Sequence, residues 1–273
     1  GFFMLYVVCI IGIGIILLLM MTYSKLNKVD CENENVGEDI STLIVDREDL
    51  KKCAREISTV PSAVQRKSCK KQLIKSLDKS YGRILAGYNF FDEEIKNREE
   101  IVSCAEWLLD NLYLVKKEYK DIKNNMSEKY YKNLPVMTEG TMKGFPRIYY
   151  IARQMLSKTQ GTVKEDTIET FINAYQENTI LKSGELWAIP IMIRIALIQN
   201  ISSITDRMVF MQKERKRAKS EAENIINSKE NENEIIHKLK DKNIKFTPHF
   251  TEGFIKILRD NFIGNAEIYK WID

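Results

Sequence analysis

Residues 181–204 read LKSGELWAIPIMIRIALIQNISSI, the most apolar stretch of the chain after its N-terminus. Apolar side chains point all round the helix that this stretch predicts, which is typical of a helix buried in a protein core or in a membrane. Pro190 and Arg194 interrupt it and leave too short a clean run to cross the ~30 Å hydrocarbon core of a bilayer. We therefore expect a central helix buried within the protein.

Turn-forming residues are scarce along the whole chain. Its 273 residues include only 12 Gly and 5 Pro, while 44% of the residues are hydrophobic and 29% are charged. A sequence this poor in turn residues, and rich in Leu, Ile, Lys and Glu, favours helices joined by short loops. We therefore predict an all-α fold, in which an N-terminal transmembrane helix is followed by a multi-helix bundle of about seven or eight helices.

Local start and stop signals place the other helices around the central one. Asp46 is a plausible N-cap, Pro61 ends the helix that follows it, and Gly161 is a natural stop for a later helix. Pro146 stands at the favoured first position of a helix. The predicted helices lie between Asp46 and Pro61 and then over residues 62–85, 91–123, 146–158, 165–176, 181–204 and 247–262.

The N-terminal stretch Phe2–Thr22 contains no charged residue. Because a helix of ~20 apolar residues spans a bilayer, we predict a transmembrane anchor at residues 1–23 and a polar linker at 24–45. Two lysines soon after the apolar run favour a cytoplasmic body, so the predicted localisation is the cell membrane with a single N-terminal pass. The chain starts with Gly rather than Met, so we expect a fragment of a longer protein.

Charged residues of both signs are interleaved along the chain. The 42 Lys and Arg and the 38 Asp and Glu give a formal net charge of +4, which does not predict a nucleic-acid partner. A charged tract at 212–245 separates a helical body at 46–211 from the start of a further helical unit at 246–273. A basic cluster in this tract is either a solvated helix face or a surface for anionic lipid headgroups. The candidate lipid-facing residues are Lys213, Arg215, Lys216 and Arg217.

The common catalytic motifs are absent from the sequence. It contains no GxxxxGK[ST], GxGxxG or GxSxG pattern. Only two His occur, and the five Cys form no CxxC pair, so neither a zinc site nor a disulfide framework fits. We therefore assign no catalytic residue, metal ligand or cofactor to this chain.

Several acidic residues next to tryptophans remain as candidates for chemistry. Glu106 precedes Trp107, Glu185 lies two residues before Trp187, and an aspartate follows Glu106 by one helical turn. Two such carboxylates are the acid and base of glycoside chemistry. The alternative, which we favour, is that Glu185 or Glu106 forms a buried ion pair with Arg194 or with Arg147. The candidate buried polar cluster is Glu106, Asp110, Arg147, Glu185 and Arg194.

An ordered set of short segments resembles a known family. The segments are CAEWLLDN (104–111), YYKNLP (130–135), GFPRIY (144–149), FINAYQ (171–176), LKSGELWAIPIM (181–192), TPHF (247–250) and LRD (258–260). In this order and spacing they resemble the N-terminal region of the cyclic β-1,2-glucan synthases, which are large membrane-bound bacterial glycosyltransferases. The resemblance covers residues 46–262, and the charged tract at 212–245 departs from the family's pattern.

The resemblance implies a multi-domain enzyme that builds β-1,2-glucan from UDP-glucose, closes it into a ring and carries a C-terminal module similar to glycoside phosphorylases. In that family the helical region precedes the transferase domain. The family's Asp-x-Asp and Gln-x-x-Arg-Trp motifs are absent from this chain. A divalent metal with UDP-glucose would therefore belong to a downstream domain, and the expected partners of this chain are the membrane and downstream domains of the same polypeptide.

The sequence leaves three hypotheses for the function of this chain. The first is a non-catalytic helical, membrane-anchoring part of a glucan synthase. The second is a stand-alone membrane-tethered helical interaction protein. The third is an independent glycoside-acting enzyme that uses Glu106, Asp110 or Glu185; we expect too few helices for the helical toroids that act on sugars.

Overall fold

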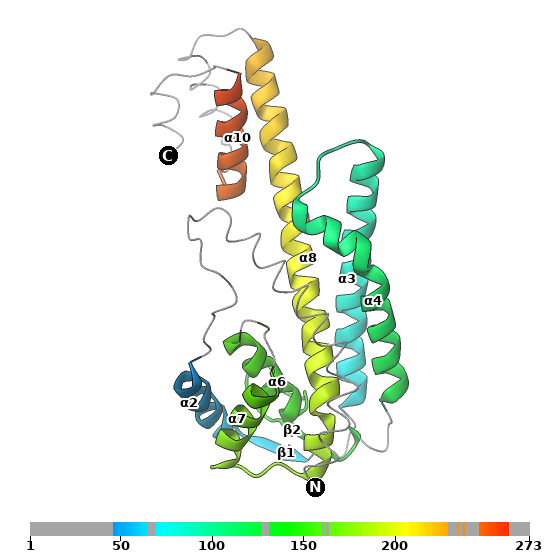
Figure 1. Cartoon of the computed structure of the whole chain (residues 1–273), viewed down its shortest axis with the longest axis vertical. Helices are drawn as coiled ribbons and strands as arrows, with labels where there is room; N and C mark the ends of the chain where they lie inside the picture. Colours follow the sequence, from blue (N-terminus) through cyan, green and yellow to red (C-terminus); the bar gives the residue numbers. More distant parts are fainter. Residues whose placement is uncertain are drawn as a thin grey trace. The chain divides into compact units, whose positions relative to one another are not determined.

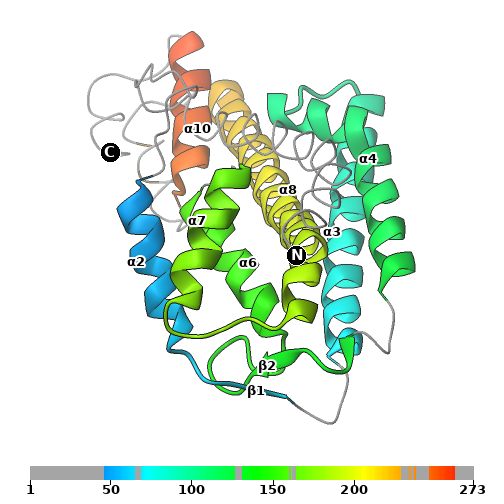
Figure 2. The same cartoon turned by 60° about the horizontal axis from the view of Figure 1, so that its bottom comes forward.

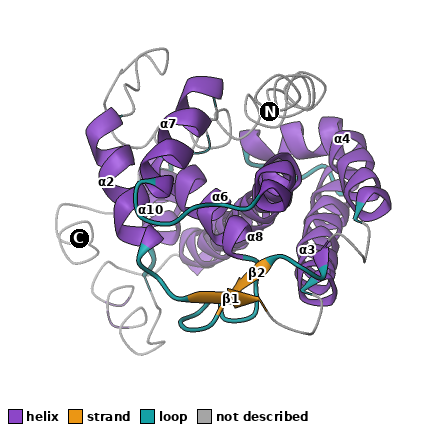
Figure 3. Ribbon diagram, turned by 90° about the horizontal axis from the view of Figure 1, so that it is seen from below, coloured by secondary structure: helices purple, strands orange, loops and turns teal. Residues whose placement is uncertain are grey.

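The computed structural model describes residues 46–64, 69–126, 131–159, 161, 164–228, 234, 237 and 246–261. The predicted anchor and linker lie outside these ranges. Within them, seven helices and one pair of short strands occur, which agrees with the predicted all-α class (Figures 1 and 3). The elements are α2 (Arg47–Ser58), β1 (Ser62–Val64), α3 (Lys70–Lys96), α4 (Ser103–Asn125), β2 (Pro135–Met137), α6 (Arg147–Lys158), α7 (Glu165–Gln176), α8 (Ser183–Ser228) and α10 (Pro248–Asp260).

Helix α2 forms where its sequence signals predicted it. The side chain of Asp46 accepts a hydrogen bond from the backbone N–H of Glu48 at 2.9 Å, the bond expected of an N-cap. An apolar stripe on α2 packs against α6 and α7. The buried residues of this stripe are Leu50, Cys53, Ala54 and Ile57.

The segment after Pro61 differs from the predicted helix over 62–85. Strand β1 pairs antiparallel with β2, and Ser62 lies opposite Met137 (Figure 3). Gly144, in the left-handed conformation at φ 83°, donates its N–H to the carbonyl of Met137 at 2.8 Å. The prediction was wrong for residues 62–64, because so short a strand carries no periodicity and its partner lies far along the chain. Residues 70–85 are helical as predicted.

Helix α3 continues through residues 86–90, which lie between two of the predicted helices. Ile84 and Phe91 flank Gly87 and are both fully buried. A helical glycine costs ~1 kcal/mol relative to alanine, whereas each buried large apolar side chain contributes about 1.5–3 kcal/mol. The predicted helix over 91–123 is therefore corrected: residue 91 belongs to α3, and the next helix, α4, begins only at Ser103.

The chain divides into two compact units. Of the described residues, the first unit contains those up to Asp92 together with Ser103–Thr205. The second unit contains Glu93–Val102 and the residues from Asp206 onward. Helices α3 and α8 each contribute to both units.

Helix α8 forms the core of the first unit, where it runs beside α3 and α4 (Figures 1 and 2). Most apolar side chains of residues 181–204 are buried, with Met192, Ile193 and Ile195 at 0% exposure, whereas Trp187 is 40% exposed. In length and composition α8 is apolar enough to cross a membrane, but 72% of its most apolar window is buried inside the protein. Pro190 lies within the helix without ending it.

The second unit has a small apolar core of its own. Phe250, Phe254 and Leu258 of α10 pack on Ala218 and Ala222 of α8. Small residues on α8 allow the two helices to approach closely, and Thr247 caps α10 by accepting from the N–H of Phe250. The charged tract is thus helical from its start to the end of α8 at Ser228.

Candidate functional site

Arg147 and Glu185 form a bidentate ion pair in the interior of the first unit. Arg147 donates from Nε to Glu185 Oε1 at 2.9 Å and from Nη2 to Glu185 Oε2 at 2.6 Å, and their side chains are 8% and 0% exposed. The Lys182 N–H donates to Oε2 at 3.0 Å, and Arg147 also donates to Ser62 Oγ and the Ile180 carbonyl. Both oxygens of the carboxylate are thus used to join β1, α6 and the start of α8.

Arg194 pairs with Glu118 rather than with Glu185. The Arg194 Nε donates to Glu118 Oε2 at 2.6 Å, and the Glu118 side chain is 1% exposed. Of the two arginines predicted as partners of Glu185, Arg147 is therefore confirmed and Arg194 is wrong. Nine residues of helix separate Glu185 from Arg194 by roughly 14 Å along the axis of α8, which is too far for direct contact.

The other two acids of the predicted cluster lie elsewhere. Glu106 and Asp110 are exposed on α4, so they are not part of a buried polar cluster. Glu185, by contrast, is fully buried, so it lies in different surroundings from these two acids. No group of three or more His, Cys, Asp or Glu that could hold a metal ion occurs in the described part of the chain.

A second buried polar connection was not predicted. The Tyr149 hydroxyl donates to Gln199 Oε1, and Gln199 Nε2 donates to Ser76 Oγ at 2.8 Å, which links α6, α8 and α3. Burial raises the pKa of Tyr149, so the phenol stays neutral and acts as a donor. Gln199 and Glu118 gave no sequence signal, because their burial depends on which face of each helix meets the others.

In the second unit, Gln212 connects the turn after α3 to α8. Its side chain is 2% exposed and accepts from the Val102 N–H at 3.2 Å. It donates to the Glu100 carbonyl at 2.8 Å and to Glu94 Oε2 at 3.3 Å. All the hydrogen-bonding groups of this buried amide are thus used, which fixes the turn on α8.

The same turn contains an arginine in an unusual backbone conformation. Arg98 has φ 58°, in the left-handed region that normally holds glycine. The Arg98 N–H donates to the Ile95 carbonyl and the Glu99 N–H donates to the Glu94 carbonyl, at 2.9 and 3.0 Å. This is the Schellman pattern that closes the C-terminus of a helix.

The four basic residues predicted to face lipid do not share one environment. Arg217 lies over the Phe250 ring at 4.2 Å and pairs with Glu214 at 2.8 Å. Lys216 pairs with a glutamate of the α3 terminus, Glu94, at 3.0 Å. Lys213 and Arg215 are exposed. Two of the four basic residues therefore hold the second unit together, which the sequence pattern did not indicate.

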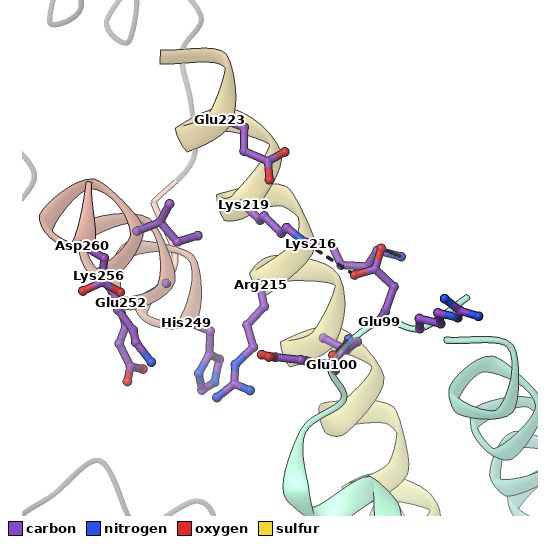
Figure 4. A pocket seen from close by; sticks show the side chains of 14 residues that line it. Glu99, Glu100, Arg215, Lys216, Lys219, Glu223, His249, Glu252, Lys256 and Asp260 are labelled. Carbon is purple, nitrogen blue, oxygen red and sulfur yellow. Dashed lines mark hydrogen bonds and ion pairs between the residues drawn. The ribbon is translucent and has the colours of Figure 1, made fainter. Parts of the chain in front are cut away.

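A cleft of about 630 Å³ lies in the second unit, between α8, α10 and the turn after α3 (Figure 4). Arg215 and Lys216 line it from α8, His249 and Lys256 from α10, and Glu100 from the turn. Its size falls in the range of small-molecule sites, ~300–1,000 Å³. Ten of its fourteen lining residues are Lys, Arg, Asp or Glu.

Comparison with known proteins agrees with the resemblance in the sequence segments. No protein-family model matches the chain. Over 191 residues it is 26% identical to the cyclic β-(1,2)-glucan synthase NdvB of Rhizobium meliloti (strain 1021). The match covers 70% of this chain and 7% of that protein. Most of this chain is therefore similar to a small part of a cyclic β-(1,2)-glucan synthase.

Proposed function

We propose that the chain is a non-catalytic helical part of a glycosyltransferase that makes cyclic β-1,2-glucan, and that it anchors and orders the enzyme at the membrane. The observation that carries this proposal is the 191-residue similarity to the glucan synthase, which extends across most of the helical body. In this proposal UDP-glucose and its divalent metal bind to a transferase domain, and the cell membrane and the remaining domains are this chain's partners. The body faces the cytoplasm.

The ion pairs of the first unit support a structural role. Among the described residues of the first unit, the buried carboxylates of Glu185 and Glu118 are each held by an arginine from another helix. A general acid or base needs an oxygen directed at its substrate, whereas both oxygens of Glu185 are occupied by Arg147 and the N–H of Lys182. The polar interior thus joins helices.

The proposal is tested in membranes of the source organism. Membranes that carry the intact gene should incorporate labelled glucose from UDP-glucose into β-1,2-glucan. Disruption of the gene should abolish that incorporation, and the 273-residue chain expressed alone should not restore it. Unchanged glucan synthesis after disruption would exclude this function.

A second candidate is the membrane-tethered interaction protein that the sequence left open. Ile180, Tyr113 and Phe210 are 81%, 65% and 50% exposed, and each would be shielded from water if a partner protein covered it. The DNA sequence after the codon for Asp273 separates the two candidates. A transferase domain with an Asp-x-Asp motif in the same reading frame favours the synthase, and an immediate stop codon favours the interaction protein.

A further inference from the structure

The cleft of the second unit has a balanced charge. Apart from His249, five of its lining residues are Lys or Arg and five are Asp or Glu. The Lys and Arg side chains would attract a bound anion, but the Asp and Glu side chains would repel it. A bound cation would be repelled by the Lys and Arg side chains and attracted by the Asp and Glu side chains. The lining therefore favours an uncharged ligand that both donates and accepts hydrogen bonds.

Intramolecular contacts already hold part of this lining in place. Lys216 pairs with Glu94 at 3.0 Å, and Lys219 approaches Glu99 at 3.8 Å. The buried amide of Gln212 holds the backbone of the turn. These contacts hold one side of the cleft in place before any ligand binds. Fewer side chains then have to be ordered on binding, which lowers the entropy cost.

Three other side chains present hydrogen-bonding groups to the cleft. Arg215 from α8 and His249 from α10 extend in the same direction in the view of Figure 4, and Glu100 lines the cleft from the turn. A guanidinium offers planar paired donors, a carboxylate offers paired acceptors, and an imidazole nitrogen donates or accepts. Neighbouring hydroxyl groups on a sugar ring match this set, because each hydroxyl both donates and accepts.

We infer that this cleft binds a neutral saccharide, a short segment of β-1,2-linked glucose, through Arg215, His249 and Glu100. The choice of a glucan among saccharides rests on the proposed function. Half-buried Ile257 supplies an apolar patch in the lining for the C–H face of a ring. Such a site would hold the growing or finished product close to the enzyme without acting on it chemically.

The test is saturation-transfer NMR on the full 273-residue chain, in a detergent without a sugar headgroup. The probe is the β-1,2-linked glucose disaccharide, and inorganic phosphate serves as the charged competitor. Wild-type protein should transfer saturation to the disaccharide, and phosphate should not displace it. Arg215→Ala and Glu100→Gln should each weaken binding about tenfold, the effect of losing one hydrogen bond to a charged group.

Lys213→Ala is the matched control, because Lys213 is an exposed basic residue of α8 outside the cleft. It should bind the disaccharide as tightly as wild type. Absence of transfer in wild type, equal binding by Arg215→Ala and Glu100→Gln, or displacement by phosphate would each overturn the inference. None of these results bears on glucan synthesis by membranes, so the proposed function stands or fails separately.

Discussion

At the scale of single residues, the buried pair of Arg147 and Glu185 carries the largest expected effect on stability. Arg147→Met leaves the carboxylate buried without its partner, which should lower the unfolding free energy by about 3–5 kcal/mol. Adding Glu185→Leu should recover most of that loss, because the double variant no longer buries an unpaired charge at this site. Urea unfolding of the full chain measures both differences.

The matched control is Arg55→Met, which removes an ion pair of similar geometry at the surface. Arg55 Nε lies 2.6 Å from Glu177 Oε2, and both side chains are largely exposed. Solvent screens this pair, so the loss should be far smaller than for Arg147→Met. Equal losses at the two arginines would show that the interior pair is not desolvated as the structure indicates.

Replacing Arg98 should raise the unfolding free energy, whereas replacing Arg147 should lower it. With φ 58° at the end of α3, it occupies a backbone conformation in which glycine carries no steric penalty. Arg98→Gly should raise the unfolding free energy by roughly 0.5–1 kcal/mol. Lys96→Gly, within the last turn of the same helix, should lower it by up to ~1 kcal/mol. A loss in stability at residue 98 would contradict the backbone assignment.

At the scale of elements, the turn between α3 and α4 depends on one buried amide. Gln212→Leu would leave the Val102 N–H and the Glu100 carbonyl without their partner. Each unpaired buried group costs ~1–3 kcal/mol, so the variant should unfold at distinctly lower urea concentration. Amide hydrogen exchange at Val102 should accelerate in the variant, and unchanged exchange there would contradict the hydrogen bond.

The docking of α10 on α8 should depend on pH through Glu214. Burial raises the pKa of this carboxyl, but hydrogen bonds from Thr247 and Arg217 outweigh burial and lower the pKa below its usual 4.5. The stabilisation is therefore fully present above pH 4.5 and is lost as the pH falls through the lowered value. The stability difference between wild type and Glu214→Gln should shrink in that acid range. A difference independent of pH would contradict the assignment.

Local signals account for the elements that were predicted well. The N-cap at Asp46 and the punctuation by Pro146 and Gly161 act within one helical turn, so the bounds of α2, α6 and α7 were predictable from neighbours in sequence. Strand β1 and the role of Glu118 were not, because both depend on partners far along the chain. Amphipathic patterns show which face of a helix is apolar, but they do not show which helix covers it.

At the scale of the whole molecule, the two compact units differ in the interactions that stabilise each of them. The first has a large apolar core crossed by buried ion pairs, whereas the second combines a small apolar cluster around Phe250, Phe254 and Leu258 with a charged cleft. The similarity to the glucan synthase covers 70% of the chain. In the proposed function, the first unit is a rigid helical support and the second carries the ligand-binding surface.

The central claim, that the chain serves glucan synthesis without taking part in the chemistry, is tested by one rate. The measurement is the incorporation of glucose from UDP-glucose into β-1,2-glucan by membranes, per molecule of the natural gene product. It compares wild type with the double variant of Arg147→Met and Glu185→Leu. We predict glucan synthesis at the same rate per molecule in both. A collapse of the rate in a folded double variant, or no synthesis by wild type above membranes that lack the gene, would contradict the account.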